Sequence, residues 1–126
     1  MPGHDGGGPL GAQGELVATD TLRRQGYRIL ERNYRCPLGE LDVVARKGKT
    51  LVFVEVKSGL DERIPPRDRV DARKKRKLSQ VAMFYLKEHG LEGVSARFDV
   101  VEVSFPVDGG TPRVELIPNA FDLDGT

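Results

Sequence analysis

The sequence contains one cysteine and no tryptophan, and it has no long apolar run. Cys36 cannot form a disulfide within the chain, so nothing indicates an oxidising compartment. No stretch approaches the roughly 20 apolar residues that a membrane-spanning helix needs. The first residues also lack the basic start and the apolar core of a signal peptide. We therefore expect a cytoplasmic protein without a membrane partner.

Histidine is nearly as scarce as cysteine, because the chain has only His4 and His89. Two distant histidines and one cysteine do not supply a zinc site or a Cys-His nucleophile pair. A length of 126 residues suits one hydrophobic core and is too short for two. The glycine-rich residues 1–9 are expected to form a tail, residues 10–121 one domain, and residues 122–126 an acidic tail.

The spacing of apolar residues predicts two helices and five strands in the order α-β-β-β-α-β-β. The helices are expected at 10–25 and 68–89, and the strands at 27–34, 41–46, 50–57, 96–104 and 114–117. The short turns between the first three strands predict an antiparallel meander, and the second helix should return the fourth strand parallel to the third. The fold class is therefore α/β, with a mixed sheet of about five strands flanked by helices.

Three charged residues on two neighbouring predicted strands are placed to converge. Glu55 and Lys57 are two positions apart in the third strand, so both side chains leave the same face of the sheet. The short turn at 47–49 pairs this strand with the preceding one and brings Asp42 close to Glu55. Charged groups at the end of an apolar strand are costly to bury unless they are paired or bind a metal. Asp42, Glu55 and Lys57 are therefore candidate catalytic residues.

This combination suits hydrolysis of a phosphodiester bond. The carboxylates of Asp42 and Glu55 and the carbonyl of Val56 offer the oxygen ligands that Mg²⁺ or Mn²⁺ selects. Such an ion acidifies a bound water and offsets charge on the scissile phosphate. Lys57 beside it can orient or deprotonate that water, or stabilise the transition-state phosphate. A Glu-x-Lys pair alone is common on exposed strands, where it carries no such role.

Several blocks of the sequence resemble one known family. The blocks GELDVVA at 39–45 and LVFVEVK at 51–57 contain the three candidate residues, and further blocks lie at 14–15, 26–35, 97–101 and 117–121. Together they resemble the YraN-like family of small bacterial predicted endonucleases. That family is similar to the archaeal Holliday junction resolvases of the PD-(D/E)xK nuclease superfamily. The resemblance covers nearly the whole chain and implies a restriction-endonuclease-like domain.

The resemblance also implies roles for particular residues. It assigns Asp42, Glu55 and Lys57 to the catalytic set of the superfamily and Glu15 to its acidic residue in the first helix. Lys74 stands where related resolvases often carry a glutamine or a lysine. The chain departs from the superfamily at Leu41, which replaces the proline before the aspartate. It departs from the family at Ser58-Gly59, where Thr-Arg or similar is common, so a basic residue that could contact phosphate is missing. Apart from the resemblance, Glu15 is ordinarily a favourable charge near the positive end of a helix.

The charges are unevenly distributed although the net charge is only +1. Seven basic and two acidic residues lie between Arg67 and Lys77, whereas six acidic residues and one basic residue follow from Asp99 onward. The basic stretch could hold a phosphate backbone. Helical spacing turns Lys74 inward and Arg73 and Lys77 outward, and we expect these three to contact nucleic acid. The alternative is an ordinary solvated helix face.

Two function classes remain open from the sequence. The first is a magnesium-dependent or manganese-dependent endonuclease acting on DNA that is branched, flapped or damaged. The second is a non-catalytic nucleic-acid-binding or assembly factor that retains the nuclease fold. The intact set of Asp42, Glu55 and Lys57 favours the first class, because a binder has no reason to retain all three. Resolvases act as twofold dimers on junctions with two equivalent strands, which leaves a homodimer open here.

Overall fold

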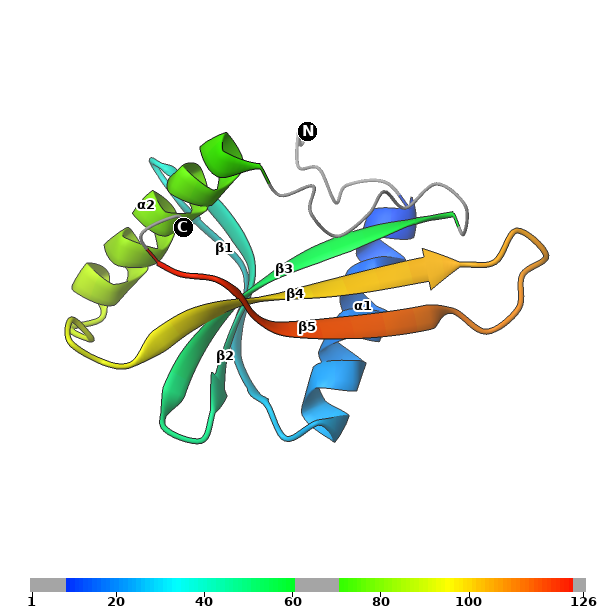
Figure 1. The fold of residues 1–126 in the computed structure, drawn as a ribbon, viewed down its shortest axis with the longest axis horizontal. Helices are drawn as coiled ribbons and strands as arrows, with labels where there is room; N and C mark the ends of the chain where they lie inside the picture. Colours follow the sequence, from blue (N-terminus) through cyan, green and yellow to red (C-terminus); the bar gives the residue numbers. More distant parts are fainter. Residues whose placement is uncertain (1–8, 61–70, 124–126) are drawn as a thin grey trace.

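The structure, a computed structural model, describes residues 9–60 and 71–123, except for the side chains of residues 9 and 10. Two helices and five strands follow one another in the order predicted from the sequence (Figure 1). They are α1 (Pro9–Arg24), β1 (Arg28–Cys36), β2 (Gly39–Lys47), β3 (Thr50–Leu60), α2 (Ala72–Glu88), β4 (Ala96–Phe105) and β5 (Arg113–Phe121). The predicted single α/β domain is confirmed.

The five strands form one mixed sheet in the order β1-β2-β3-β4-β5. β2 pairs antiparallel with both β1 and β3, across two-residue turns at 37–38 and 48–49. α2 returns β4 parallel to β3, with Val54 opposite Asp99, and β5 runs back antiparallel to β4. The predicted meander and the predicted parallel return are both confirmed.

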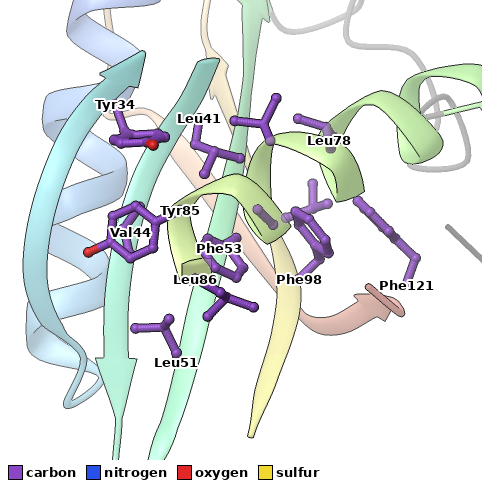
Figure 2. Close-up of a cluster of buried hydrophobic side chains, with 13 residues drawn as sticks. Tyr34, Leu41, Val44, Leu51, Phe53, Leu78, Tyr85, Leu86, Phe98 and Phe121 are labelled. Carbon is purple, nitrogen blue, oxygen red and sulfur yellow. The ribbon is translucent and has the colours of Figure 1, made fainter. Parts of the chain in front are cut away.

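The sheet is covered by one helix on each face (Figure 1). On one face, Ala18 and Leu22 of α1 pack against small and β-branched side chains of the inner strands. On the other, Tyr85 of α2 makes an edge contact with the ring of Phe53, at 5.8 Å between centroids (Figure 2). The central strand β3 is thus buried on both sides, which explains its continuous apolar run at 51–54.

The second helix begins later than the sequence predicted. Its first residue is Ala72 rather than residue 68, because Asp71 occupies the N-cap position. The Asp71 carboxylate accepts a hydrogen bond from the Lys74 backbone N–H at 2.9 Å, which satisfies a donor that the helix leaves open. Residues 68–70 of the predicted helix lie outside the described residues. The helix ends at Glu88, one residue earlier than expected.

All five strands are longer than predicted, and the extensions of β3 and β5 have clear physical reasons. β3 continues to Leu60, because its last residues pair in parallel with β4 as far as Phe105. Residues 61–70, which follow β3, lie outside the described residues. β5 runs from Arg113 to Phe121 rather than over 114–117, and it includes Pro118. A proline is tolerated there because β5 is an edge strand of the sheet.

A buried carboxylate fixes the edge strand β5. Asp99 is fully buried and accepts hydrogen bonds from the Tyr27 hydroxyl at 2.6 Å, Arg97 Nε at 2.9 Å and the Asn119 N–H at 2.8 Å. Asn119 has a positive φ of 52° beside an irregularity in the β4–β5 register. Burial and Asp99 raise the pKa of Tyr27 to about 12, so its hydroxyl remains a donor. This network is structural and lies on the face of the sheet that α1 covers.

The predicted terminal segments fall largely beyond the described residues. Pro9, which was expected to belong to the tail 1–9, is the first residue of α1, a position that proline favours. Residues 1–8 lie outside the described residues, and so do residues 124–126 of the expected acidic tail 122–126. Neither helix in the described part of the chain is long and apolar enough to span a membrane.

Candidate active site

The candidate site lies where the ladder between β2 and β3 ends. The last paired residues are Val43 and Val54, so the next positions along the two strands are Asp42 and Glu55. Past Val43 and Val54, the Asp42 side chain replaces a backbone acceptor, because its Oδ2 accepts a hydrogen bond from the Val56 N–H at 2.8 Å. The two strands separate at this point, and Asp42 lies in the fork between them.

Two lysines contact the same oxygen of Glu55. Lys57 Nζ lies 3.3 Å from Glu55 Oε2, as expected for side chains two positions apart on one strand. Lys74 Nζ, from the first turn of α2, lies 2.7 Å from the same oxygen. The Glu55 side chain is only 9% exposed, so these ammonium groups neutralise a carboxylate with little access to solvent.

The Asp42 carboxyl group is destabilised in its charged form. Burial is the largest cause that raises its pKa well above the usual range, and the negative charge of Glu55 is the next. A hydrogen bond with the Glu55 side chain and the charge of Glu15 act in the same direction, whereas the Val56 N–H opposes them. Two close carboxyl groups in a poorly solvated place resist simultaneous ionisation.

The two lysines differ in how tightly they hold a proton. Burial lowers the pKa of Lys57, and the charge of Lys74 lowers it further, while Glu55 opposes both effects. Burial is the largest single influence on the pKa of Lys74 and acts to lower it. The charge of Glu55, the side-chain hydrogen bonds of Lys74 and the charge of Asp42 together outweigh burial and raise that pKa overall. Lys74 is therefore the permanent cation of the pair, and Lys57 releases its proton more readily.

Glu15 approaches the fork from the α1 side of the sheet. Its residue is only 6% exposed, and its charge is close enough to raise the pKa of Asp42. The structure therefore brings Glu15 within electrostatic reach of Asp42, although Glu15 belongs to a different layer. A plain surface role near a helix end does not account for this burial.

The outward residues of α2 are placed as helical spacing predicted. Arg73 and Lys77 are exposed, while Lys74 turns inward to Glu55. The aliphatic part of Lys77 lies along the β1–β2 turn, with its Cε 3.8 Å from where a Cβ of Gly39 would stand. Residues 67–70 of the basic stretch lie outside the described residues, so its described part begins at Asp71.

A divalent metal would have few protein ligands in this site. Within residues 9–60 and 71–123, no group of three or more Asp, Glu, His or Cys side chains is placed to hold a metal ion. Mg²⁺ nevertheless accepts one or two carboxylates and completes its shell with water. Asp42 and Glu55 fit that requirement, because a divalent cation relieves the repulsion that raises the pKa of Asp42. The Val56 carbonyl shares the side of β3 on which its N–H meets Asp42, as strand geometry requires.

Because burial and the charge of Glu55 disfavour the ionised form of Asp42, removing the charge of Asp42 is expected to stabilise the folded protein. A group whose pKa is raised by folding contributes stability below its unfolded pKa of about 3.9, and loses it as pH rises through the folded value. Asp42→Asn removes the charge and keeps an oxygen that can accept the Val56 N–H. At neutral pH without divalent metal, we expect its free energy of unfolding to exceed that of the wild type by about 1–2 kcal/mol. Urea denaturation in EDTA measures this difference.

The matched control is Asp20→Asn, which changes an exposed carboxylate on α1. Its effect should stay within about 0.5 kcal/mol at every pH. The gain of Asp42→Asn should shrink toward zero near pH 3, where both proteins carry a neutral group at position 42. If Asp42→Asn is less stable than the wild type at neutral pH, the fold does not destabilise the ionised Asp42 carboxylate.

One contact next to this site, between Gly14 and Ser58, was not predicted from the sequence. Gly14 of α1 lies against Ser58 of β3, where a Cβ on the glycine would stand 2.6 Å from both Ser58 Cβ and Ser58 Oγ. The available signal was a glycine inside a predicted helix, which usually has a packing reason. Ser58 gave no such signal, because only the tertiary structure places it beneath α1.

The chain matches the family described as "Uncharacterised protein family UPF0102" over residues 14–103, a range that includes Glu15, Asp42, Glu55, Lys57 and Lys74. A "UPF0102 protein" of Geobacter metallireducens is 46% identical over 115 residues, which cover 90% of this chain and 93% of the relative. A "UPF0102 protein" of Moorella thermoacetica is 46% identical over 112 residues, with 88% and 93% covered.

Among solved structures, Pyrococcus furiosus SfsA in complex with Ca²⁺ aligns with 83% of this chain and 59% of its own, at 17% identity and a TM-score of 0.39. A likeness this distant carries no argument about the site. The family match and the relatives, by contrast, extend over most of the chain. The matched range includes the five site residues Glu15, Asp42, Glu55, Lys57 and Lys74. The chain belongs to the UPF0102 family, the YraN-like family that its sequence blocks resembled.

Proposed function

We propose that this protein is a metal-dependent endonuclease that hydrolyses phosphodiester bonds in DNA. The observation that carries the proposal is the convergence of Asp42, Glu55 and Lys57 in the fork, joined by Lys74. A purely structural role explains this arrangement poorly. An ion pair that only stabilises the fold needs one carboxylate and a cation, and it does not require a second carboxylate beside the first. The raised pKa of Asp42 is the cost of that second carboxylate.

Asp42 and Glu55, with the carbonyl of Val56, would hold Mg²⁺ or Mn²⁺. When bound, such an ion supplies an acidified water and offsets negative charge on the phosphate. Lys57 would orient that water and accept its proton, since burial and Lys74 lower the pKa of Lys57. Lys74 keeps its charge, and it would stabilise the negative charge that develops on the phosphate oxygens.

The start of α2 would bring the DNA backbone to these groups. Lys74 lies in the first turn of the helix, so the helix N-terminus faces the same region as Glu55. Backbone N–H groups at a helix N-terminus favour phosphate. Arg73 and Lys77 are exposed on the outer side of the same turns and would contact phosphates further along the strand.

Replacing Arg73 and Lys77 together by alanine is expected to weaken binding to all DNA sequences alike, because phosphate contacts carry no sequence information. The slope of log affinity against log salt should flatten by ~1–2 units, at about 0.9 per lost contact. Fluorescence anisotropy from low to moderate salt measures both effects. Lys74→Ala should instead reduce cleavage more than binding, since its side chain lies on Glu55.

The control is Lys87→Ala, in the last turn of α2. It removes one exposed charge from the same helix, far along the axis from Lys74, and should leave the salt slope unchanged. An unchanged slope in the Arg73→Ala/Lys77→Ala variant would return these residues to the solvated helix face considered from the sequence.

The activity itself is tested by metal titration followed by cleavage of junction, flap and linear DNA substrates. The proposal requires cleavage that depends on Mg²⁺ or Mn²⁺ and stops in EDTA. Salt-sensitive DNA binding without cleavage of any substrate would instead support the non-catalytic binding factor. The mass of the protein in solution should be measured alongside, because cutting both strands of a junction requires two sites and hence a homodimer.

A further inference from the structure

A glycine of α1 lies in close contact with the sheet. Gly14 is buried in the second turn of α1, and an added Cβ would stand 2.6 Å from both Ser58 Cβ and Ser58 Oγ. Real Cβ atoms essentially never come within 3.0 Å of another heavy atom, so any other residue would move the helix or the strand. A glycine inside a helix costs about 1 kcal/mol relative to alanine, so the chain accepts a less stable helix at this position.

The two partners of this contact each adjoin a residue of the candidate site. Gly14 precedes Glu15, and Ser58 follows Lys57. The contact therefore joins the helix that carries Glu15 to the strand that carries Glu55 and Lys57. Glu15 is buried beside this crossing, with its charge felt at Asp42.

The remainder of α1 cannot follow a displacement at Gly14. Ala18 and Leu22, one and two turns further along the helix, are completely buried in the core beneath it. A side chain at position 14 would therefore tilt the first turns of α1 away from β3 about these fixed residues. Glu15 would move outward with those turns.

We propose that Gly14 is a positioning residue whose missing side chain sets how deeply Glu15 enters the fork beside Asp42. The positional part of this inference stands on the geometry of α1 and β3. Its consequence for catalysis rests on the endonuclease function proposed above. A glycine that served packing alone would affect the stability of the protein and leave the influence of Glu15 on the fork unchanged.

The backbone amide of Val56 reports on the fork directly, because it donates to Asp42 Oδ2. In the wild-type protein, Glu15→Gln should shift the ¹⁵N–¹H resonance of Val56. In a Gly14→Ala background the same substitution should shift it by less than half as much. Gln13→Ala, at an exposed position of the same helix, is the control background and should leave the full shift.

Ser58 separates the steric cause from any other. In the Gly14→Ala protein, Ser58→Gly removes both atoms that the new Cβ would meet and should restore the full Glu15→Gln shift. Ser58→Ala removes the hydroxyl but keeps the Cβ at 2.6 Å, so it should not restore the shift. The two single variants of Ser58 correct for the loss of the hydroxyl itself.

An equal Glu15→Gln shift in the wild-type and Gly14→Ala backgrounds would overturn the inference. If Gly14→Ala does not fold, the comparison passes to folding itself. The Gly14→Ala/Ser58→Gly protein should then recover the circular dichroism of the wild type, and the Gly14→Ala/Ser58→Ala protein should not. Failure of Ser58→Gly to recover the fold would overturn the inference as well.

If the endonuclease function holds, Gly14→Ala should lower kcat by about tenfold to a hundredfold with little change in KM, as a small displacement of a catalytic group does. Ser58→Gly should rescue kcat in the same protein. A wild-type protein without cleavage activity would contradict the proposed function alone, since the Val56 resonance tests the position of Glu15 independently of activity.

Discussion

Replacing Asp42 with asparagine is expected to abolish the heat of Mg²⁺ or Mn²⁺ binding and to reduce DNA cleavage by about 10³-fold or more. Asparagine keeps the size of the side chain and an acceptor for the Val56 N–H, so the fork should retain its shape. It lacks the charge that a hard divalent ion requires of a carboxylate. Loss of the several kcal/mol that a metal contributes to the transition state corresponds to such a rate effect. Isothermal titration calorimetry and a cleavage time course measure the two quantities.

The pH dependence of metal binding gives this prediction a second measurement. Because the pKa of Asp42 is raised, a proton competes with the metal at higher pH than for an ordinary carboxylate. The affinity of the wild type for Mn²⁺ should therefore weaken as pH falls through that raised value, and binding should release protons to the buffer. Asp20→Asn serves as the control and should bind as the wild type does. Equal metal binding by Asp42→Asn and wild type would remove Asp42 from the site.

Replacing Lys57 with alanine is expected to lower kcat by about 10²–10⁴-fold while the affinities for metal and DNA change little. This range is typical for loss of a group that transfers a proton in the transition state. The lowered pKa of Lys57 suits that role, whereas Lys74 holds its proton more tightly. Single-turnover cleavage, calorimetry and anisotropy distinguish loss of chemistry from loss of binding.

Lys57→Arg separates the two roles open to this residue. An arginine keeps the positive charge but does not give up its proton in a protein. Activity as low as that of Lys57→Ala would indicate that Lys57 acts as a base, and substantial recovery would indicate that its charge stabilises the phosphate. If Lys57→Ala weakens DNA binding as much as it lowers activity, Lys57 is a binding residue and the catalytic assignment is wrong.

The order of the elements could be derived from the sequence because it depends on local patterns. The apolar run at 51–54, which contains β-branched and aromatic residues, specified the central strand, and the turn at 47–49 specified its antiparallel partner. These two features alone place Asp42 beside Glu55, and the two-residue period of a strand places Lys57 beside Glu55. Helical spacing likewise directed Lys74 inward, where it meets Glu55.

The ends of the elements were less predictable, because they depend on partners distant in the sequence. β3 reaches Leu60 because β4 is there to pair with it, and β5 continues through Pro118 because it lies at the edge of the sheet. α2 begins at Ala72 rather than at the predicted residue 68, although the sequence contained Asp71, the aspartate that caps it. Helix propensities alone do not decide whether the helix begins after this cap or at the charged residues before it.

The sequence by itself determined which residues share a strand face and which strands are neighbours, since periodicity and turn length fix both. Only the tertiary structure decided that Asp42 replaces a backbone acceptor for Val56, that Lys74 meets the same oxygen of Glu55 as Lys57 does, and that Gly14 lies on Ser58. Each of these contacts joins elements from different layers, or strands that have separated. Their distances depend on how the helices pack on a twisted sheet, and no local pattern encodes that packing.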